Sequence, residues 1–355
     1  MPRSKDAGPV SPVRNQRRTT ALIVGILFSA IFLGLSLRRI DPHGLGDALM
    51  QSQWWPWYAL APVLYMAGHF VRGLRCRTIL RPHCDLDLWT ATNCTIIGYA
   101  ANNLLPARMG EVVRAYVLGR KASVSVSLAL AVTFLERLLD GLSITCILVV
   151  AGRFAPLPEW GKKLLWVATG VFVSAAVAVA LITAARPLVR RVAEGVTSFL
   201  PPALARRLLT ILDRAFGATD CLRDPRLTIT ILALSLGVWL VEGSMFLIVL
   251  PAFGLPMNPL WAGMALSVTN LGILIPSSPG YIGPFHYFCM QALLIFGVPQ
   301  ETALGYAIMV HLLYYIPVTL WGVSALAAYG ISLGSAVRTA PAGPVALGGE
   351  PEVAR

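Results

Sequence analysis

Long runs without a single charged residue constrain this sequence more than any other feature. Thr19–Leu37, Leu164–Ala185 and Thr302–Val337 contain no Asp, Glu, Lys or Arg, and Gly243–Gln300 is a still longer run of this kind. A helix that spans a bilayer needs about 20 predominantly apolar residues, whereas a helix on a soluble core carries a polar face. With 56% hydrophobic and 13% charged residues, the chain is predicted to be an all-α polytopic membrane protein.

The positions of Lys and Arg predict how the chain crosses the membrane, because these residues concentrate in cytoplasmic loops. This rule accounts for the net charge of +12, so no nucleic acid partner is expected. Residues 1–18 form a basic tail that places the N-terminus in the cytoplasm, and residues 331–355 form a second tail; we expect both to be disordered. The domain between them, residues 19–330, is predicted to have about six full spans, at Thr19–Leu37, Trp54–Val71, Ala122–Gly152, Leu164–Ala185, Leu227–Leu250 and Thr302–Gly330.

Two further apolar segments fit re-entrant hairpins better than spans. If Leu88–Ala107 crossed the membrane, the basic residues from Arg108 to Lys121 would lie outside, whereas a hairpin returns them to the cytoplasm. Pro259–Val298 is broken by prolines and predicts a second hairpin, which opens to the outside. The same charge rule places in the cytoplasm the arginines that follow the second span: Arg72, Arg75, Arg77 and Arg81.

The two hairpins share a sequence pattern in which Asn precedes Pro-x-x-x-Gly. Pro106 and Pro276 lie 170 positions apart, and the same offset carries the second span onto Leu227–Leu250. The sequence therefore predicts an inverted repeat of two halves. Interrupted segments at corresponding positions of such halves point to the binding site of a transporter. The residues that form the hairpin backbones are Pro106 and Gly110 in the first hairpin and Asn270, Pro276, Gly280 and Gly283 in the second. Asn103 is a candidate substrate-binding residue.

Three ionisable residues interrupt the apolar span at Ala122–Gly152: Glu136, Arg137 and Asp140. Charges inside a membrane need partners or water and commonly mark a substrate path. Arg137 and Asp140 are three residues apart on a helix and can pair, so Glu136 needs a cation from elsewhere, which Arg108 or Arg114 can supply. Two interpretations remain open: a site for a phosphate-sized anion, or an ion-pair network that only holds the first hairpin against its neighbour. Glu242, in the other half, is a second candidate.

The cytoplasmic segment 186–226 contains a predicted amphipathic helix at residues 204–222. Its apolar residues recur at helical spacing, and arginines lie off their stripe. Such a helix either lies at the interface and contacts anionic headgroups or packs on cytoplasmic loops. The stripe consists of Leu204, Leu208, Ile211, Ala215, Ala218 and Leu222, and the arginines are Arg206, Arg207 and Arg214.

The sequence offers little support for enzymatic or metal chemistry. The six cysteines are scattered without a C-x-x-C pair, and the cluster His83, Cys84, Asp85 and Asp87 lacks the spacing of a zinc site. There is no G-x-S-x-G, H-E-x-x-H, Walker or G-x-G-x-x-G motif. We therefore expect no cofactor, no metal and no enzymatic activity, and transport that is facilitated or ion-coupled rather than driven by ATP.

Three strings in order resemble the lysylphosphatidylglycerol synthase transmembrane region, also called the flippase-like family. They are Asn103-Leu-Leu-Pro-Ala-Arg-Met-Gly-Glu-Val-Val-Arg114, Phe134-Leu-Glu-Arg-Leu-Leu-Asp140 and Pro276-Ser-Ser-Pro-Gly-Tyr-Ile-Gly283. The resemblance implies a helical membrane domain that moves a modified phospholipid between leaflets. It also implies a polar signature at Arg108, Glu111, Arg114, Glu136, Arg137 and Asp140.

The best-known members of that family carry a large aminoacyltransferase domain after this region, whereas this chain ends soon after Gly330. We therefore expect no lysine transfer, which also puts aminoacylated phosphatidylglycerol in doubt as the substrate. The first hypothesis is a lipid translocase of a bacterial inner membrane, with a polar or phosphorylated lipid headgroup held between the hairpins. The alternative is a non-transporting accessory subunit that serves an enzyme of lipid or cell-envelope glycan synthesis.

Overall fold

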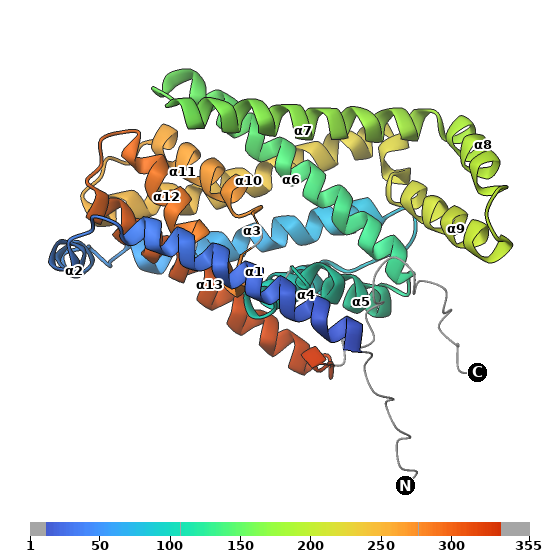
Figure 1. Cartoon of the computed structure of the whole chain (residues 1–355), viewed down its shortest axis with the longest axis horizontal. Helices are drawn as coiled ribbons and strands as arrows, with labels where there is room; N and C mark the ends of the chain where they lie inside the picture. Colours follow the sequence, from blue (N-terminus) through green and yellow to red (C-terminus); the bar gives the residue numbers. More distant parts are fainter. Residues whose placement is uncertain (1–11, 107, 276, 335–355) are drawn as a thin grey trace, which may run out of the picture.

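The computed structural model describes residues 12–106, 108–275 and 277–334, with side chains from residue 23 onward, and no described residue lies in a β-strand (Figure 1). The α-helices are α1 (Pro12–Leu37), α2 (Pro42–Met50), α3 (Trp57–Leu80), α4 (Leu88–Leu104), α5 (Gly110–Ala122), α6 (Val126–Phe154), α7 (Glu159–Ala184), α8 (Arg186–Thr197), α9 (Pro202–Ala218), α10 (Pro225–Val249), α11 (Pro259–Gly272), α12 (Pro284–Leu294) and α13 (Gln300–Ala328). Three short 3-10 turns complete the fold: η1 (Asp220–Arg223), η2 (Leu250–Phe253) and η3 (Pro279–Tyr281).

Local sequence explains where several of these helices begin. The carboxylate of Asp87 accepts a hydrogen bond from the backbone N–H of Thr90, and this bond caps the start of α4. Asn258 caps α11 in the same way through the N–H of Leu260. A proline follows the cap residue of both α10 and α11, at a position where its missing N–H costs nothing.

Six long helices coincide with the six predicted spans: α1, α3, α6, α7, α10 and α13. By length and composition, α7, α10 with η2, and α13 are long and apolar enough to cross a membrane, and α1 with α2 makes a fourth candidate that bends by 87°. The helices α3 and α6 have 24 and 29 residues but carry charged residues in their middle turns. The prediction of a helical polytopic membrane protein is confirmed.

One prediction about the second span is wrong. Its helix does not end at Val71, because α3 continues to Leu80. Arg72 and Arg75, expected in the cytoplasm, are therefore inside the bundle, with 2% and 1% of their surface exposed. The reason is that both arginines meet carboxylates of other helices, and these partners make burial of the charge tolerable. Arg77 and Arg81 follow on the exposed part of the helix end.

The packing contains an internal repeat of four helices. In the first half α3 packs on α4, α4 on α5 and α5 on α6, and in the second half α10, α11, α12 and α13 pack in the same order. The halves also exchange equivalent contacts, since α4 packs on α13 and α11 packs on α6. The central helices α3 and α10 run antiparallel and contact each other along their lengths (Figure 1). Antiparallel equivalents are what an inverted repeat requires.

The predicted hairpins are the helix pairs α4–α5 and α11–α12, called hairpin 1 and hairpin 2 below. Hairpin 1 lies toward one end of the elongated molecule and hairpin 2 toward the other (Figure 1). Their tips approach each other near the centre, where the guanidinium of Arg108 meets the backbone carbonyl of Ile273. The side of the membrane to which each hairpin opens stays a prediction.

The terminal and amphipathic segments differ in part from the expectation. Helix α1 begins at Pro12, so residues 12–18, predicted to be disordered, are helical; residues 1–11 and 335–355 lie outside the described residues. Segment 186–226 contains two helices, α8 and α9, and α9 with η1 covers the predicted amphipathic stripe. Only the end of the predicted stripe packs inward: Ala218 is buried, whereas Leu204 and Leu208 are exposed.

Candidate functional site

A chain of buried ion pairs begins at hairpin 1 and runs toward the centre of the bundle. Arg114 on α5 pairs with Glu136 on α6 at 2.5 Å. Arg75 on α3 lies between two carboxylates of α6, at 3.7 Å from Glu136 and 2.7 Å from Asp140. All four residues are buried. A buried charge is tolerated only with an opposite charge and hydrogen bonds beside it, so these helices are held in one register.

Arg72 continues this chain into the second half of the molecule. Its guanidinium lies 3.5 Å from Asp140 on α6 and 2.5 Å from Glu242 on α10. Asp140 also accepts a hydrogen bond from the indole N–H of Trp239, at 3.0 Å. Arg72 lies over the Trp239 ring at 4.9 Å and over the Tyr99 ring at 5.1 Å, where cation–π attraction adds to the ion pairs.

The pairs expected from helix spacing are present. Arg137 contacts Asp140 three residues later on α6 at 3.2 Å, and Arg114 is the cation that Glu136 was expected to need. Glu111 of hairpin 1 lies 4.0 Å from Arg137. Four arginines thus face four carboxylates in one connected network, whose charges cancel: Arg72, Arg75, Arg114 and Arg137 against Glu111, Glu136, Asp140 and Glu242.

A cavity of about 310 Å³ lies beside this network, between the two hairpin tips and helices α3, α6, α7 and α10. This volume is at the lower end of the range for small-molecule sites. Its lining includes polar and aromatic residues such as Arg137, Tyr99 and Trp239. It also includes apolar residues such as Ile144 of α6 and Phe172 of α7. The cavity therefore offers both charged and apolar contacts to one occupant.

Arg108 differs from the other arginines that line or support this cavity. It occupies the left-handed region with a φ of 53° at the tip of hairpin 1. Its guanidinium donates to the carbonyl oxygen of Ile273 at 2.9 Å and lies 5.7 Å from the centre of the Tyr281 ring. Within the described chain, no carboxylate lies within 4.0 Å of Arg108. Arg108 therefore adds one positive charge to a network that is otherwise balanced.

The tip of hairpin 1 depends on a close approach between its two helices. Gly110 donates its backbone N–H to the side-chain carbonyl of Asn102 at 2.8 Å. A Cβ at Gly110 would lie 2.1 Å from the carbonyl oxygen of Gly98, so only glycine fits. Asn103 donates from its side chain to Thr319 of α13 at 2.8 Å, which fixes the tip to the second half. Pro106 lies in the turn between these helices.

The tip of hairpin 2 is held by backbone turns and by α1. Gly280 and Gly283 have φ values of 71° and 97°, which favour glycine. Ser278 beside them donates its N–H to the hydroxyl of Ser29 on α1, at 2.9 Å. Asn270 lines the cavity, and its side chain donates to the carbonyl of Leu266 in its own helix. Pro276 lies outside the described residues.

The histidines and the acidic cluster near His83 take structural positions. His286 and His311 are buried and contact each other at 3.1 Å, and His311 also contacts the carbonyl of Gly280. His69 is buried and contacts the carbonyl of Tyr65. His83 contacts the carbonyl of Gly217 at 2.8 Å. In the described parts of the chain, no group of three or more His, Cys, Asp or Glu residues is arranged to hold a metal ion.

The structure separates the candidate residues into two sets. Those that line the cavity are Asn103, Arg108, Glu111, Arg137, Asp140 and Glu242. Arg114 and Glu136 do not line it and form an ion pair with each other. Arg72 and Arg75 were not among the predicted site residues, because the charge rule places them in a cytoplasmic loop. A signal was present, because Arg72 and Glu242 are separated by the repeat offset of 170.

The chain is similar to a known protein family and to two known proteins. The model of the family "Lysylphosphatidylglycerol synthase TM region" matches residues 22–322. The chain is 26% identical to the glycosyltransferase AglD of Haloferax volcanii over 359 residues, which cover 91% of this chain and 57% of that protein. It is 21% identical to the UPF0104 membrane protein MJ1078 of Methanocaldococcus jannaschii over 221 residues, 62% of this chain and 90% of that protein.

No solved structure gives a significant match. The family match covers the charged motif of hairpin 1, the charged turns of α6 and the tip of hairpin 2. It therefore includes every residue that lines the central cavity. Together with the apolar helices, it shows an integral membrane protein. The chain belongs to the family of the lysylphosphatidylglycerol synthase transmembrane region.

Proposed function

We propose that this protein is a lipid translocase of a bacterial inner membrane, with its N-terminus in the cytoplasm. It moves a polar or phosphorylated lipid between leaflets, and the lipid headgroup binds in the central cavity between the hairpin tips. The chain itself catalyses no reaction in this proposal; its partners are the membrane phospholipids or another lipid.

The position of Arg108 carries the proposal. The other four arginines of the site each have a carboxylate partner, so an anion that bound to them would have to displace that partner. Arg108 lines the cavity, and in the described parts of the chain its guanidinium contacts a backbone carbonyl and an aromatic face and pairs with no carboxylate. A guanidinium binds phosphate oxygens in a bidentate manner. An anionic headgroup is the occupant that would complete the charge balance.

Reconstitution tests this proposal. Purified protein is placed in liposomes that contain a fluorescent phosphatidylglycerol, and dithionite quenching measures how fast the lipid exchanges leaflets. Arg108→Gln should slow exchange about tenfold or more, because a hydrogen bond to a charged group contributes about 1.5–3 kcal/mol. Arg108→Lys should retain part of the rate. Arg81→Gln, at the exposed end of α3, is the matched control and should leave the rate unchanged. Equal rates with and without protein would refute translocation of this lipid.

One observation favours the alternative of an accessory subunit in lipid or cell-envelope glycan synthesis: the Haloferax relative is named a glycosyltransferase. In that case the ion pairs serve only to hold the helices, and a synthase of the envelope is the partner. Such a subunit would co-purify with that enzyme from the native membrane and would not exchange lipids in liposomes. Arg108→Gln would then leave the association intact.

A further inference from the structure

A second, larger cavity opens on the side of the bundle, between α6, α7 and α9. Its volume is about 660 Å³. Its walls are almost entirely apolar and include Phe134 and Leu135 of α6, Val179 of α7 and Ile211 of α9. We call this cavity the lateral groove. A groove of this composition favours hydrocarbon over a polar headgroup, because its few polar lining residues are Ser127, Arg214 and Thr219.

The lateral groove adjoins the central cavity. Leu138 of α6 lines both, so this one side chain forms the wall between them. On α7, Val171 and Ala175 line the central cavity, and the next turns of the same helix, with Val179 and Ile182, line the groove. Residues four apart lie on one helix face. The seam between α6 and α7 therefore leads from the charged site to the groove.

Helix α7 lines both the central cavity and the lateral groove. It runs along the outside of the bundle (Figure 1), and only 6% of its apolar window is buried. Its inner contact is local: a Cβ at Gly141 of α6 would lie 1.9 Å from the ring of Phe172, so this ring fills a notch that glycine leaves open. The lateral groove opens beside the later turns of α7, at Val179 and Ile182.

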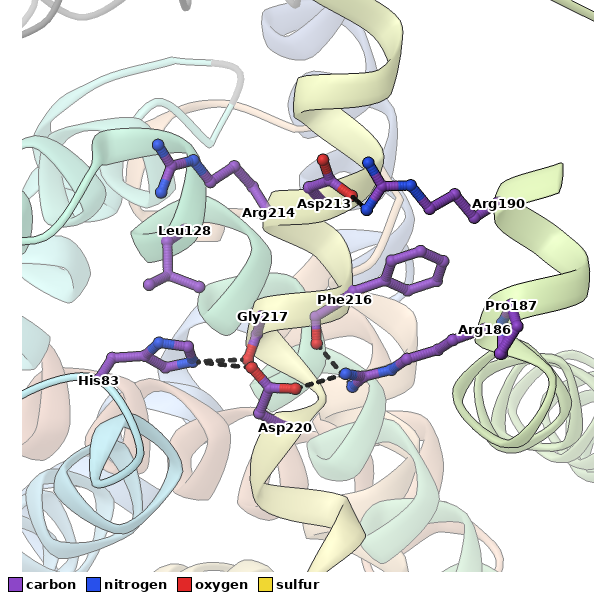
Figure 2. Close-up of a pocket in the computed structure, with 10 residues that line it drawn as sticks. All are labelled: His83, Leu128, Arg186, Pro187, Arg190, Asp213, Arg214, Phe216, Gly217 and Asp220. Carbon is purple, nitrogen blue, oxygen red and sulfur yellow. Dashed lines mark hydrogen bonds and ion pairs between the residues drawn. The ribbon is translucent and has the colours of Figure 1, made fainter. Parts of the chain in front are cut away.

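At its far end the groove borders a further pocket. This pocket has a volume of about 570 Å³ and contains Arg186 and Arg190 (Figure 2). Both cations are already paired there: Arg186 with Asp220, and Arg190 with Asp213 at 3.4 Å. These pairs hold α8 against α9 and η1. Arg214 extends from the opposite side of α9 and borders the groove itself (Figure 2).

From this adjacency we infer that the lateral groove holds an alkyl chain of the same lipid whose headgroup occupies the central cavity. The inference rests on the proposed function, since it assigns the tail of the proposed substrate. The lipid lies with its phosphate at Arg108 and its chain past Leu138, between α6 and α7. A hydrocarbon chain in the groove covers the apolar side chains that line it. The site thus selects a lipid by a headgroup charge and by one long chain.

Photolabelling tests this inference. The full chain is placed in nanodiscs with a phosphatidylglycerol that carries a diazirine near the end of one acyl chain, and labelled residues are mapped by mass spectrometry. We expect labels on Phe134 and Ile211 in the groove, and also on Val173, which faces outward from α7 with 47% exposure. Arg108→Gln and Leu138→Trp should each lower the groove labels severalfold and leave the label on Val173 unchanged.

Controls separate the failure of this inference from that of the proposed function. Val179→Trp narrows the groove from α7 and replaces Leu138→Trp if that variant does not fold; Val173→Trp is the matched outward control. A second probe carries the diazirine on the glycerol headgroup and should label Tyr281 or Tyr99. If the headgroup probe labels the cavity but the groove labels are unchanged in Arg108→Gln and Leu138→Trp, the groove holds bulk lipid and the inference is wrong. If the headgroup probe leaves the cavity unlabelled, the proposed headgroup site fails, and the inference falls with it.

Discussion

Arg72 of α3 and Glu242 of α10 form an ion pair at 2.5 Å, and the two residues are 170 positions apart, the offset that relates the two hairpin prolines. They occupy equivalent positions in the two halves of the repeat. Equivalent residues can touch only near the axis that relates the halves, so this pair marks the pseudo-two-fold axis. The central cavity, which both residues line, lies beside it.

The two halves are not equivalent in charge. Among the residues of the ion-pair network, only Glu242 belongs to the second half. At the offset of 170 from Glu136, Arg137 and Asp140, the second half has Tyr306, Ala307 and Val310. The repeat therefore places the cavity near the axis, whereas the charged wall is made almost wholly by α3, hairpin 1 and α6.

The axial ion pair should be important for stability. Glu242→Gln removes a carboxylate from Arg72 and leaves it with Asp140 alone, so the free energy of unfolding should fall by up to about 3–5 kcal/mol, the usual cost of breaking a buried pair. Arg72→Gln with Glu242→Gln should restore part of the loss. Thermal unfolding in detergent measures both. Glu159→Gln breaks an exposed pair with Lys162 and should change the midpoint little. A similarly small effect of Glu242→Gln would contradict the structural role.

Arg108 and Arg114 should respond oppositely to the same substitution. Arg114→Gln leaves Glu136 buried with Arg75 at 3.7 Å as its remaining cation, so the melting temperature should drop clearly. Arg108→Gln loses one bond to a backbone carbonyl, so the midpoint should stay nearly unchanged while the amount of co-purified anionic lipid falls. Mass spectrometry of bound lipid is the second measurement. A large drop in midpoint for Arg108→Gln with unchanged lipid would show that Arg108 is structural.

The tip of hairpin 1 should tolerate no side chain at Gly110. Gly110→Ala places a Cβ 2.1 Å from a backbone oxygen and 2.5 Å from the Asn102 side chain, so the two helices must separate and both stability and lipid exchange should fall. Gly170→Ala in α7 is the matched control, because nothing lies within 4 Å of its Cβ. That change should stabilise the helix by about 0.5–1 kcal/mol. Equal midpoints for the two variants would refute the close approach.

Helix α8 should lie with its apolar face in the membrane interface. Leu188, Val192 and Val196 are each about four residues apart and exposed, and Phe199 after the helix is 90% exposed. Such a face favours the boundary between headgroups and acyl chains. In a cysteine-free background, a fluorophore at Phe199→Cys should be quenched by spin-labelled lipid in liposomes. A fluorophore at Glu194→Cys, on the opposite face, should be quenched less. Equal quenching would instead favour a helix that packs on a partner protein.

The sequence by itself determined the class of fold and the local pairs. Charge-free runs longer than a bilayer is thick leave few alternatives to membrane helices, and a spacing of three residues on α6 brings Arg137 to Asp140. The proline motif and its offset of 170 predicted two hairpins in corresponding places, because both signals are contained in the order of residues.

Only the tertiary structure decided where Arg72 and Arg75 lie. An arginine that follows an apolar run looks the same whether it faces the cytoplasm or a buried carboxylate, because the charge rule counts residues and ignores distant partners. Here the partners are Asp140 and Glu242, which are 68 and 170 residues from Arg72. Their attraction offsets the cost of burial and extends α3 by two turns. The same packing left Arg108 as the cavity arginine without a carboxylate in the described chain, which sequence spacing could not distinguish from Arg114.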